Sequence, residues 1–333
     1  MMKYSERDKD FSKIYNYYRL IVEKQLKLFN GKRIPDSVYS PIKYILSSGG
    51  KRFRPILVIL ACEAVGGKLS EAIYAAAAIE MLHNFTLVHD DIMDHAELRR
   101  GRLTVHKKWD ENTAILAGDE MIAQAYKVLL RTKSPALKHI LQVYTDAFVQ
   151  VCEGQGMDKE FESKKNVSLA DYFKMISKKT GRVISASTEI GGIIGGGTKK
   201  QLIALRKYGE YLGKAFQIMD DLLDVVGNTK EFGKKIGGDI KEGKKNYLLI
   251  KAMEKVRGSD RKLLFSISPS ARVSEMFVNK AKKIYFESGV VADARKEVLK
   301  NTRKAQQAIA LLPSSNAKSL LMWLPEQFLE RTS

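Results

Sequence analysis

Two groups of aspartates in this chain share one spacing. Asp90-Asp91-Ile-Met-Asp94 and Asp220-Asp221-Leu-Leu-Asp224 both read Asp-Asp-x-x-Asp. On a helix the first and last aspartate of each group lie one turn apart on the same face, with about 6 Å between them. A single group of this kind is typical of a solvated acidic turn. Two copies that each follow an apolar segment indicate a shared chemical role.

Grouped carboxylates are oxygen ligands for a hard cation. Mg²⁺ is usually held by one or two carboxylates together with substrate phosphates. Two facing groups would therefore hold several Mg²⁺ ions bridged by a diphosphate, and the ions would act as Lewis acids on that leaving group. Ca²⁺ in an EF-hand is disfavoured, because the glycine and the alternating oxygen ligands of that loop are missing.

Basic clusters near the aspartates would supply the other half of an anion site. Guanidinium forks and ammonium charges are suited to binding phosphate. Each cluster alone is typical of solvated surface, but their position beside two metal-type motifs favours a diphosphate site. The clusters are Gly49-Gly50-Lys51-Arg52-Phe53-Arg54, Arg99-Arg100, Lys178-Lys179-Thr180, Lys234-Lys235 and Lys244-Lys245. Gly101, directly after Arg100, predicts a sharp turn there. His83, two turns before Asp90, fits this site or an ordinary core position.

Long helices must position these groups. Apolar residues recur at three- and four-residue spacing, and alternating strand patterns are almost absent. We expect a helix capped by Ser70 that runs to Asp94, a second capped by Ser168 with Asp171, and a third that Thr198 opens with Gln201 and that ends near Gly227. No linker separates two globules. The chain is therefore predicted to be all-α, a single large helical bundle over residues 1–333.

Composition excludes several classes of protein. The 333 residues are 44% hydrophobic and 29% charged, which excludes wholesale disorder. Cys62 and Cys152 cannot form a disulfide framework and are expected to be buried thiols. No signal peptide or membrane span is apparent, so a cytoplasmic location is expected. The net charge of +19 would suit nucleic acid, an anionic membrane surface or an anionic substrate. For most of the lysines a solvated surface is the simpler reading.

The ordered set of motifs resembles the trans-type isoprenyl diphosphate synthases, or polyprenyl synthetases, from Gly49 to Lys245. The resemblance rests on Gly-Gly-Lys51-Arg-Phe-Arg54-Pro, on Leu87-Val-His-Asp90-Asp-Ile-Met-Asp94 with Arg99-Arg100-Gly101, on Lys179-Thr180, on Phe216-Gln217-Ile-Met-Asp220-Asp-Leu-Leu-Asp224 and on Gly238-Asp239-Ile-Lys-Glu-Gly-Lys244. It implies an all-α helical bundle around a central cavity and a prenyltransferase activity that proceeds by ionisation, condensation and deprotonation. It also implies a homodimer. Asn246 departs from the small hydroxyl residue of many relatives.

The resemblance also implies roles for single residues. Asp90, Asp94 and Asp220 would ligate Mg²⁺, with Asp91 and Asp224 close to the ions or their waters. Isopentenyl diphosphate would be held by Lys51, Arg54, His83 and Arg100. The allylic diphosphate would be held by Arg99, Lys179, Lys235 and Lys244, while Thr180 and Gln217 would line the region where the allylic cation forms.

Product length in this family looks set beneath the first aspartate group, by Phe85, Thr86 and Leu82 here. One aromatic five residues before Asp90, with no insertion in the motif, resembles archaeal-type geranylgeranyl diphosphate synthases and predicts a C20 product. C15 and C25 products remain open, and Phe85 as ordinary core filling predicts no effect on length.

Other functions are ranked lower. A class I terpene cyclase usually carries a polar second motif in place of a full Asp-Asp-x-x-Asp. Intact aspartates argue against a non-catalytic helical regulatory subunit. A specific nucleic-acid binder would show a basic stripe with stacking aromatics, whereas these basic clusters flank acidic motifs. Weak peripheral association with an anionic membrane is compatible with the excess charge.

Overall fold

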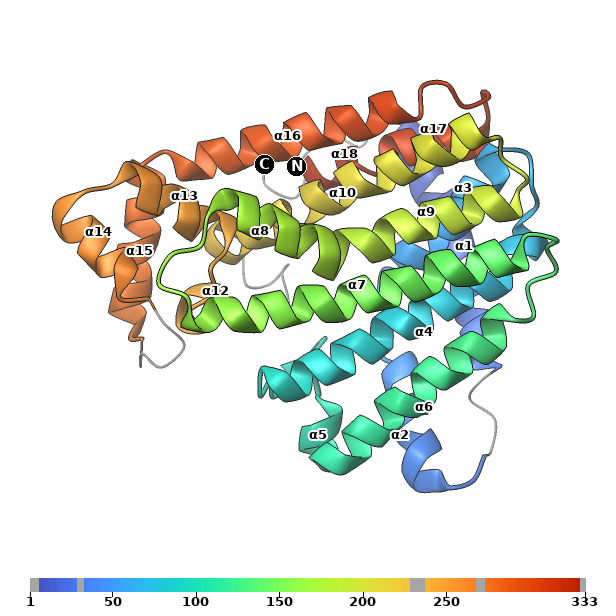
Figure 1. Cartoon of the computed structure of the whole chain (residues 1–333), viewed down its shortest axis with the longest axis horizontal. Coiled ribbons are helices and arrows are strands. Elements are labelled where there is room, and N and C mark those ends of the chain that lie inside the picture. Colours follow the sequence, from blue (N-terminus) through green and yellow to red (C-terminus); the bar gives the residue numbers. More distant parts are fainter. Residues whose placement is uncertain (1–5, 29–32, 228–236, 268–272, 330–333) are drawn as a thin grey trace. The chain divides into compact units, whose positions relative to one another are not determined.

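The computed structural model describes residues 6–28, 33–227, 237–267 and 273–329 (Figure 1). Helices account for nearly all of its regular structure, so the all-α prediction is confirmed. The helices of the first half are α1 (Glu6–Lys27), α2 (Asp36–Leu46), α3 (Phe53–Ala64), α4 (Leu69–Met93), α5 (Val105–Lys108), α6 (Glu111–Leu129) and α7 (Leu137–Ser163).

The second half continues in the same way. Its helices are α8 (Leu169–Ile176), the π-helix η1 (Ser177–Gly181), α9 (Arg182–Ile194), α10 (Lys199–Val226), α12 (Gly238–Lys241), α13 (Tyr247–Lys255), α14 (Gly258–Phe265), α15 (Glu275–Glu287), α16 (Val290–Ala308), α17 (Asn316–Trp323) and α18 (Glu326–Leu329). No helix in these described ranges is long and apolar enough to cross a lipid bilayer.

The described strands form one short hairpin. β1 (Leu98–Arg99) pairs antiparallel with β2 (Arg102–Leu103), and Leu98 lies opposite Leu103. Gly101 at its tip has a φ of +73°, a left-handed conformation that glycine adopts without steric cost. The sharp turn predicted at this glycine is confirmed. The hairpin carries Arg99 and Arg100, five and six residues after Asp94, the last residue of the first aspartate group.

Two compact units make up the described chain. The first takes its residues from 1–148, 186–206 and 311–323, and the second from 149–185, 207–310 and 324–333. Three of the boundaries fall inside α7, α9 and α10, and the other two fall between helices, after α16 and after α17. The assignment of the whole chain to one domain stays a prediction.

The core of the first unit forms around α3 and α4. Residues 56–62 of α3 and the four alanines 75–78 of α4 are completely buried. Small side chains let helices approach closely, and α4 packs along both α3 and α6. Gly191 of α9 is needed for the same reason, because a Cβ there would collide with the carbonyl oxygen of Val58 in α3.

The core of the second unit contains large aromatic side chains. Tyr172, Tyr208 and Tyr285 are almost fully buried, and the ring of Tyr172 contacts that of Tyr247 at a centroid distance of 6.2 Å. Buried tyrosine hydroxyls need hydrogen-bond partners. The Tyr172 hydroxyl donates to the Asp221 carboxylate at 2.6 Å, so this core is attached directly to the second aspartate group.

Two of the three predicted helix caps are confirmed. The Ser168 hydroxyl accepts from the Asp171 amide at 3.1 Å, and the Thr198 amide donates to the Gln201 side chain at 2.8 Å. The cap predicted at Ser70 is wrong. The Glu71 carboxylate accepts from the Lys68 amide at 2.7 Å, so α4 begins at Leu69 and Ser70 lies inside its first turn.

The cysteine prediction is half right. Cys62 is buried on α3, where nearly every side chain faces the core. The prediction is wrong for Cys152, which is exposed. It lies on α7, a helix whose side chains alternate between core and solvent with the helical period. An apolar residue type did not by itself identify the face.

The close approach at Gly191 leads to a stability prediction. Gly191→Ala is expected to lower the free energy of unfolding by about 1–3 kcal/mol, because the added methyl group overpacks the contact with Val58 and Ala61. Gly156→Ala in α7 is the matched control, since no atom lies within 4 Å of its added Cβ. There the substitution should stabilise by about 0.5–1 kcal/mol. Urea unfolding followed by circular dichroism measures both, and equal shifts in the two variants would contradict the packing argument.

Candidate active site

The first aspartate group lies at the C-terminal end of α4. Asp90 and Asp91 belong to the last turn, and Asp94 caps the helix with its amide donating to the Asp90 carbonyl at 2.8 Å. Negative charge is disfavoured at a helix C-terminus, where the dipole already carries partial negative charge. Asp90 and Asp94 are half-buried, whereas Asp91 is buried. Cations close to these carboxylates are therefore needed to offset the repulsion.

Arg99 supplies one such cation. Its Nε and Nη2 atoms lie 2.7 and 2.6 Å from Oδ1 of Asp91. Burial raises the pKa of the Asp91 carboxyl to about 6, although the Arg99 guanidinium acts in the opposite direction. The sequence placed Asp91 near the metal ions and Arg99 on the allylic diphosphate. In the structure the two side chains contact each other, and both roles stay predictions.

Arg100 connects the hairpin to the glycine-basic segment. Its Nη1 atom donates to the Ser48 hydroxyl at 3.1 Å and to the Gly49 carbonyl. Gly50 has a φ of +139°, and a Cβ there would lie 3.1 Å from the guanidinium carbon of Arg100. Glycine at position 50 thus permits both the backbone conformation and the close approach of Arg100.

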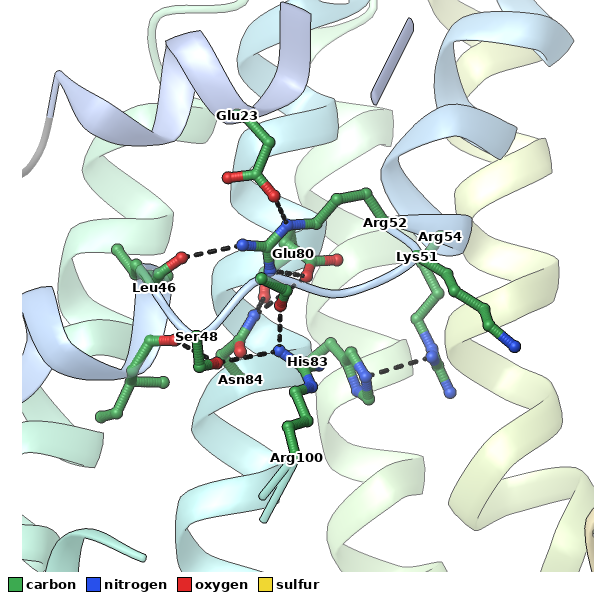
Figure 2. A network of polar contacts seen from close by, with 12 residues as sticks. Glu23, Leu46, Ser48, Lys51, Arg52, Arg54, Glu80, His83, Asn84 and Arg100 are labelled. Atoms are coloured by element: carbon green, nitrogen blue, oxygen red, sulfur yellow. Dashed lines mark hydrogen bonds and ion pairs between the residues drawn. The ribbon is translucent and has the colours of Figure 1, made fainter. Parts of the chain in front are cut away.

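His83 and Arg54 form a contact between α4 and α3. Arg54 Nη1 lies 3.2 Å from His83 Nε2 (Figure 2). Burial lowers the pKa of His83 well below its usual value, and the positive charges of Arg54 and Arg100 lower it further. The neutral imidazole can then accept a hydrogen bond from the Arg54 guanidinium. A protonated ring would place two cations against each other.

Arg52 is a residue of this segment to which the sequence gave no role. It is 2% exposed, and the structure puts it at the centre of a buried ion-pair network with Glu23 and Glu80 (Figure 2). Lys51, by contrast, is exposed. An alternation of buried and exposed basic residues in a short loop has no periodic sequence signal, so only the structure separates the two.

Phe85 packs between α4 and α7. Its ring lies 4.5 Å from that of His89 and 5.4 Å from that of Phe148, the second pair edge to face. Gly118 of α6 makes room for His89, whose ring would collide with a Cβ at that position. Leu82 is completely buried, and the Thr86 hydroxyl donates to the His83 carbonyl at 2.8 Å. Phe85 is thus held in one place by aromatic contacts.

The second aspartate group lies near the end of α10, in the second unit. Asp220 is half-buried. Asp221 is buried and accepts from the Tyr172 hydroxyl, the Tyr247 amide at 3.0 Å and the Gln217 side chain at 3.1 Å. Burial and the neighbouring charge of Asp239 raise the pKa of the Asp221 carboxyl to about 8. This side chain joins α8, α10 and α13.

Asp224 is held by backbone amides. It accepts from Gly238 at 3.0 Å and from Asp239 at 3.2 Å, at the start of α12. Burial and the charge of Asp239 raise the pKa of the Asp224 carboxyl to about 7. Asn246 donates to the Asp239 carboxylate at 2.9 Å and caps α13 by accepting from the Leu249 amide. Asn246, the departure noted in the sequence, therefore has a definite structural role.

Lys179 and Thr180 lie in the π-helix η1. The Lys179 ammonium contacts the Asp158 carboxylate of α7 at 2.6 Å, and the Thr180 hydroxyl donates to Gln217 at 2.8 Å. π-Helical turns are frequent at functional sites. Gly154 of α7 permits the contact, because a Cβ there would collide with the backbone of Lys179. Asp158 was missed by the sequence analysis, since its partner lies 21 residues away.

Lys235 and Lys244 are the remaining basic residues of the predicted site. Lys244 lies 2.9 Å from the Glu242 carboxylate, and its amide donates to the Asp239 carbonyl at 2.9 Å. The segment after α12 therefore carries Lys244 next to the acidic cluster. Lys234 and Lys235 lie outside the described residues.

The donor chemistry of both units suits a divalent ion that arrives with a phosphate ligand. Within the described part of the chain, no group of three or more histidine, cysteine, aspartate or glutamate side chains is gathered tightly enough to hold a metal ion alone. Mg²⁺ needs no such cage, because it retains waters and takes one or two carboxylates plus substrate phosphates. The half-buried pair Asp90 and Asp94 at the end of α4 and the half-buried Asp220 on α10 fit that requirement.

The predicted residues thus form one set in each unit. In Figure 2, Lys51, Arg54 and Arg100 lie near His83, which precedes Asp90 by seven residues on α4. In the second unit Lys179, Thr180 and Gln217 lie on neighbouring turns of η1 and α10 beside Asp221. The first set contains three basic side chains and a neutral histidine, and the second combines an ammonium, a hydroxyl and an amide with the Asp221 carboxylate.

Comparison with known proteins agrees with this chemistry. Residues 35–285 match the family model described as polyprenyl synthetase. The chain is 40% identical to the short chain isoprenyl diphosphate synthase of Methanothermobacter thermautotrophicus, over 89% of this chain and 91% of that protein. It is 38% identical to the geranylgeranyl pyrophosphate synthase of Geoglobus acetivorans, over 93% and 98%. The crystal structure of geranylgeranyl pyrophosphate synthetase from Pyrococcus horikoshii Ot3 superposes with a TM-score of 0.91 at 36% identity, covering 98% of this chain and all of that one.

The environment of His83 predicts its protonation. We expect the ring to stay neutral on acidification from about pH 8 to about pH 5.5, through the range where an unfolded histidine takes up a proton. Because only the unfolded state then binds the proton, His83 lowers stability as the pH falls below about 6.5, and His83→Gln removes that part of the acid sensitivity. Ring ¹⁵N shifts, assigned by comparison with the His83→Gln spectrum, measure this. A midpoint near the ordinary histidine value would contradict the assigned contact.

Proposed function

This chain belongs to the polyprenyl synthetase family, and from that premise we propose that it makes geranylgeranyl diphosphate from isopentenyl diphosphate and allylic diphosphates. It is a prenyltransferase that elongates trans-prenyl chains, and its substrates are isoprenoid diphosphates. The observation that carries the proposal is the cationic set around α4, beside a carboxylate group on the same helix. That pairing suits a diphosphate that is bound together with metal ions.

Enzymes of this family use divalent metal ions, and we propose Mg²⁺ as the ion here. Asp90, Asp94 and Asp220 would hold it, with Asp91 and Asp224 close by. Bound ions supply Lewis acidity that stabilises the leaving diphosphate. The ion pair with Arg99 would orient Asp91, and the amide contacts would orient Asp224, beside that ion.

Two sets of basic residues would bind the two diphosphates. Isopentenyl diphosphate would be held by Lys51, Arg54, His83 and Arg100, in which the neutral His83 acts through hydrogen bonds rather than charge. The allylic diphosphate would be held by Arg99, Lys179, Lys244 and Lys235. Preorganised cations of this kind stabilise charge as it develops on the leaving group. Asp158 would keep the Lys179 ammonium in place until substrate binds.

The reaction breaks the carbon–oxygen bond of the allylic diphosphate and forms a carbon–carbon bond to isopentenyl diphosphate. The double bond of isopentenyl diphosphate supplies the electron pair, and the released diphosphate takes the proton that the condensed cation loses. Thr180 and Gln217 would line the cation. Gln217 is oriented from both sides, because it accepts from Thr180 and donates to Asp221. Apolar walls on α4 would exclude the water that quenches such a cation.

A C20 product is favoured by the position of Phe85. The ring lies five residues before Asp90 on α4, which is about 7.5 Å along the helix axis. It is 7% exposed and held between His89 and Phe148, so it can serve as a rigid floor for the growing chain. Thr86 and Leu82 lie on adjacent turns and would complete that floor. Products of C15 or C25 are the alternatives.

We also propose that the protein forms a homodimer and binds weakly to anionic membranes. A homodimer would cover the exposed apolar side chains Ile115 and Leu116 of α6, which are 42% and 56% exposed. Weak binding to anionic membranes would follow from the charge of +19. A cytoplasmic location stays a prediction. A class I terpene cyclase or a non-catalytic subunit would show no elongation of any primer.

A product assay tests the activity. With Mg²⁺, isopentenyl diphosphate and a C5, C10 or C15 allylic primer, we expect a C20 alcohol after dephosphorylation and none after chelation of the metal. Asp90→Ala and Asp220→Ala should each lower turnover by roughly 100-fold or more, because each removes a carboxylate that would hold a metal ion beside the leaving diphosphate. Asp260→Ala, an exposed aspartate of α14, is the matched control. Folded protein that elongates no primer would refute the proposed function.

Product length should respond to the size of residue 85. We expect Phe85→Leu to add some C25 product and Phe85→Ala to make C25 or longer chains dominant, because the floor is removed in steps. Phe161→Ala truncates another buried phenylalanine, on α7, and should leave product length unchanged. Chromatographic sizing of the dephosphorylated products measures the shift. An unchanged C20 product from Phe85→Ala would show that this ring is only core filling.

A further inference from the structure

The segment that precedes α3 has an unusual backbone. Gly49, Gly50 and Arg52 all have positive φ values, of 71°, 139° and 50°. Glycine adopts such values readily, but an arginine in the left-handed region is strained by contact of its Cβ with the backbone. A residue of this kind persists where its surroundings hold it.

Three acceptors from three different helices hold the Arg52 guanidinium. Nε donates to the Glu23 carboxylate of α1 at 2.7 Å, and Nη1 to the Glu80 carboxylate of α4 at 2.6 Å. Nη2 donates to the carbonyl of Leu46, the last residue of α2, at 2.8 Å. The side chain itself is completely buried. A planar fork can meet three acceptors in this arrangement, whereas a lysine ammonium is a single point of charge.

The positive charge of Arg52 is paired with the carboxylates of Glu23 and Glu80 inside this network. Burial alone would lower the pKa of Arg52, but Glu80 and Glu23 raise it, so the guanidinium stays charged and paired. Asn84 completes the network, because its amide donates to Glu80 Oε1 at 3.1 Å and to the Glu80 carbonyl at 2.7 Å. Asn84 directly follows His83 on α4. The network thus attaches the loop to the helical turn that carries a residue of the diphosphate set.

The neighbours of Arg52 point elsewhere. In Figure 2 the Arg52 side chain extends toward Glu23 and Glu80, whereas Lys51 and Arg54 extend away from that network, Arg54 reaching His83. The Lys51 carbonyl is fixed by the Tyr15 hydroxyl of α1 at 2.6 Å. Arg52 is thus buried inward, while the nearest basic residues on either side of it, Lys51 and Arg54, face away from the network.

We propose that Arg52 is a positioning residue for isopentenyl diphosphate, which through Glu23, Glu80 and Asn84 holds Lys51 and Arg54 in place to bind that diphosphate. This inference rests on the proposed function, since it assumes the substrate that the flanking residues bind. Arg52 does not touch the substrate. Its partners come from α1, α2 and α4, all in the unit that carries the first aspartate group.

Steady-state kinetics of Arg52→Lys and Asn84→Ala test the proposal. Arg52→Lys keeps the charge and loses the fork, and we expect its KM for isopentenyl diphosphate to rise at least tenfold while the KM for the allylic primer stays within twofold. Asn84→Ala should raise the same KM by about threefold, because it removes only the support of Glu80. Binding of a non-reactive thio analogue of isopentenyl diphosphate, measured by calorimetry, should weaken by the same factors.

A matched control separates positioning from loss of stability. Asn301 of α16 repeats the local arrangement of Asn84, donating to the Glu297 carbonyl at 2.8 Å and to its carboxylate at 3.0 Å. Asn301→Ala should lower the thermal midpoint to a similar extent as Asn84→Ala and leave both KM values unchanged. If Arg52→Lys does not fold, the Asn84→Ala and Asn301→Ala pair decides the matter.

The outcomes are distinct. An unchanged KM for isopentenyl diphosphate in folded Arg52→Lys or Asn84→Ala, or an equal rise in the allylic KM, would overturn the positioning role. So would an equal effect of Asn301→Ala. Wild-type protein that condenses no primer would instead refute the proposed function, so the two failures can be told apart.

Discussion

Repulsion between like charges is the constraint on which this structure depends. Several guanidinium groups lie around one stretch of α4, and several carboxylates lie around the end of α10. Like charges at close range in a poorly solvated site destabilise the fold unless each is paired, neutral or solvated. The protein uses all three solutions. Arg52 and Arg99 are paired with carboxylates, His83 is held neutral, and Lys51 is exposed.

In the second unit, hydrogen bonds reduce the repulsion between the carboxylates. Asp221 and Asp224 each accept from several donors, yet burial and Asp239 still raise their pKa values to about 8 and about 7. Such carboxylates are costly to keep charged in isolation, and a divalent cation beside them would relieve that cost. The same side chains anchor α8, α12 and α13. Asp224 would therefore serve both the stability of this unit and the proposed metal binding, and its substitution should affect both.

One long helix, α4, carries several of the residues with proposed roles in the first unit. α4 carries Glu80, which supports the loop, His83, which contacts Arg54, Phe85, which packs against α7, and Asp90 at its end. Because a helix rises by about 1.5 Å per residue, the spacing of these residues along the chain is a fixed distance in space. This explains why the all-α class, the long helices and the placement of the aspartates on one helix face could be predicted. Periodicity and spacing are local properties that the helical geometry converts directly into positions.

What the sequence by itself determined was the set of helices, two of the three caps, the turn at Gly101 and the residue types suited to binding diphosphate and metal ions. It could not determine which residues share a contact across the chain. Some ion pairs join segments that are tens of residues apart, as in Arg52 with Glu23 and Glu80 and in Lys179 with Asp158. The predictions for Cys152 and Ser70 were wrong because the exposure of the first and the cap at the second depend on residues around them. Those choices belong to the tertiary structure, because burial and pairing of a charge depend on what other helices bring to it, and no local pattern records that.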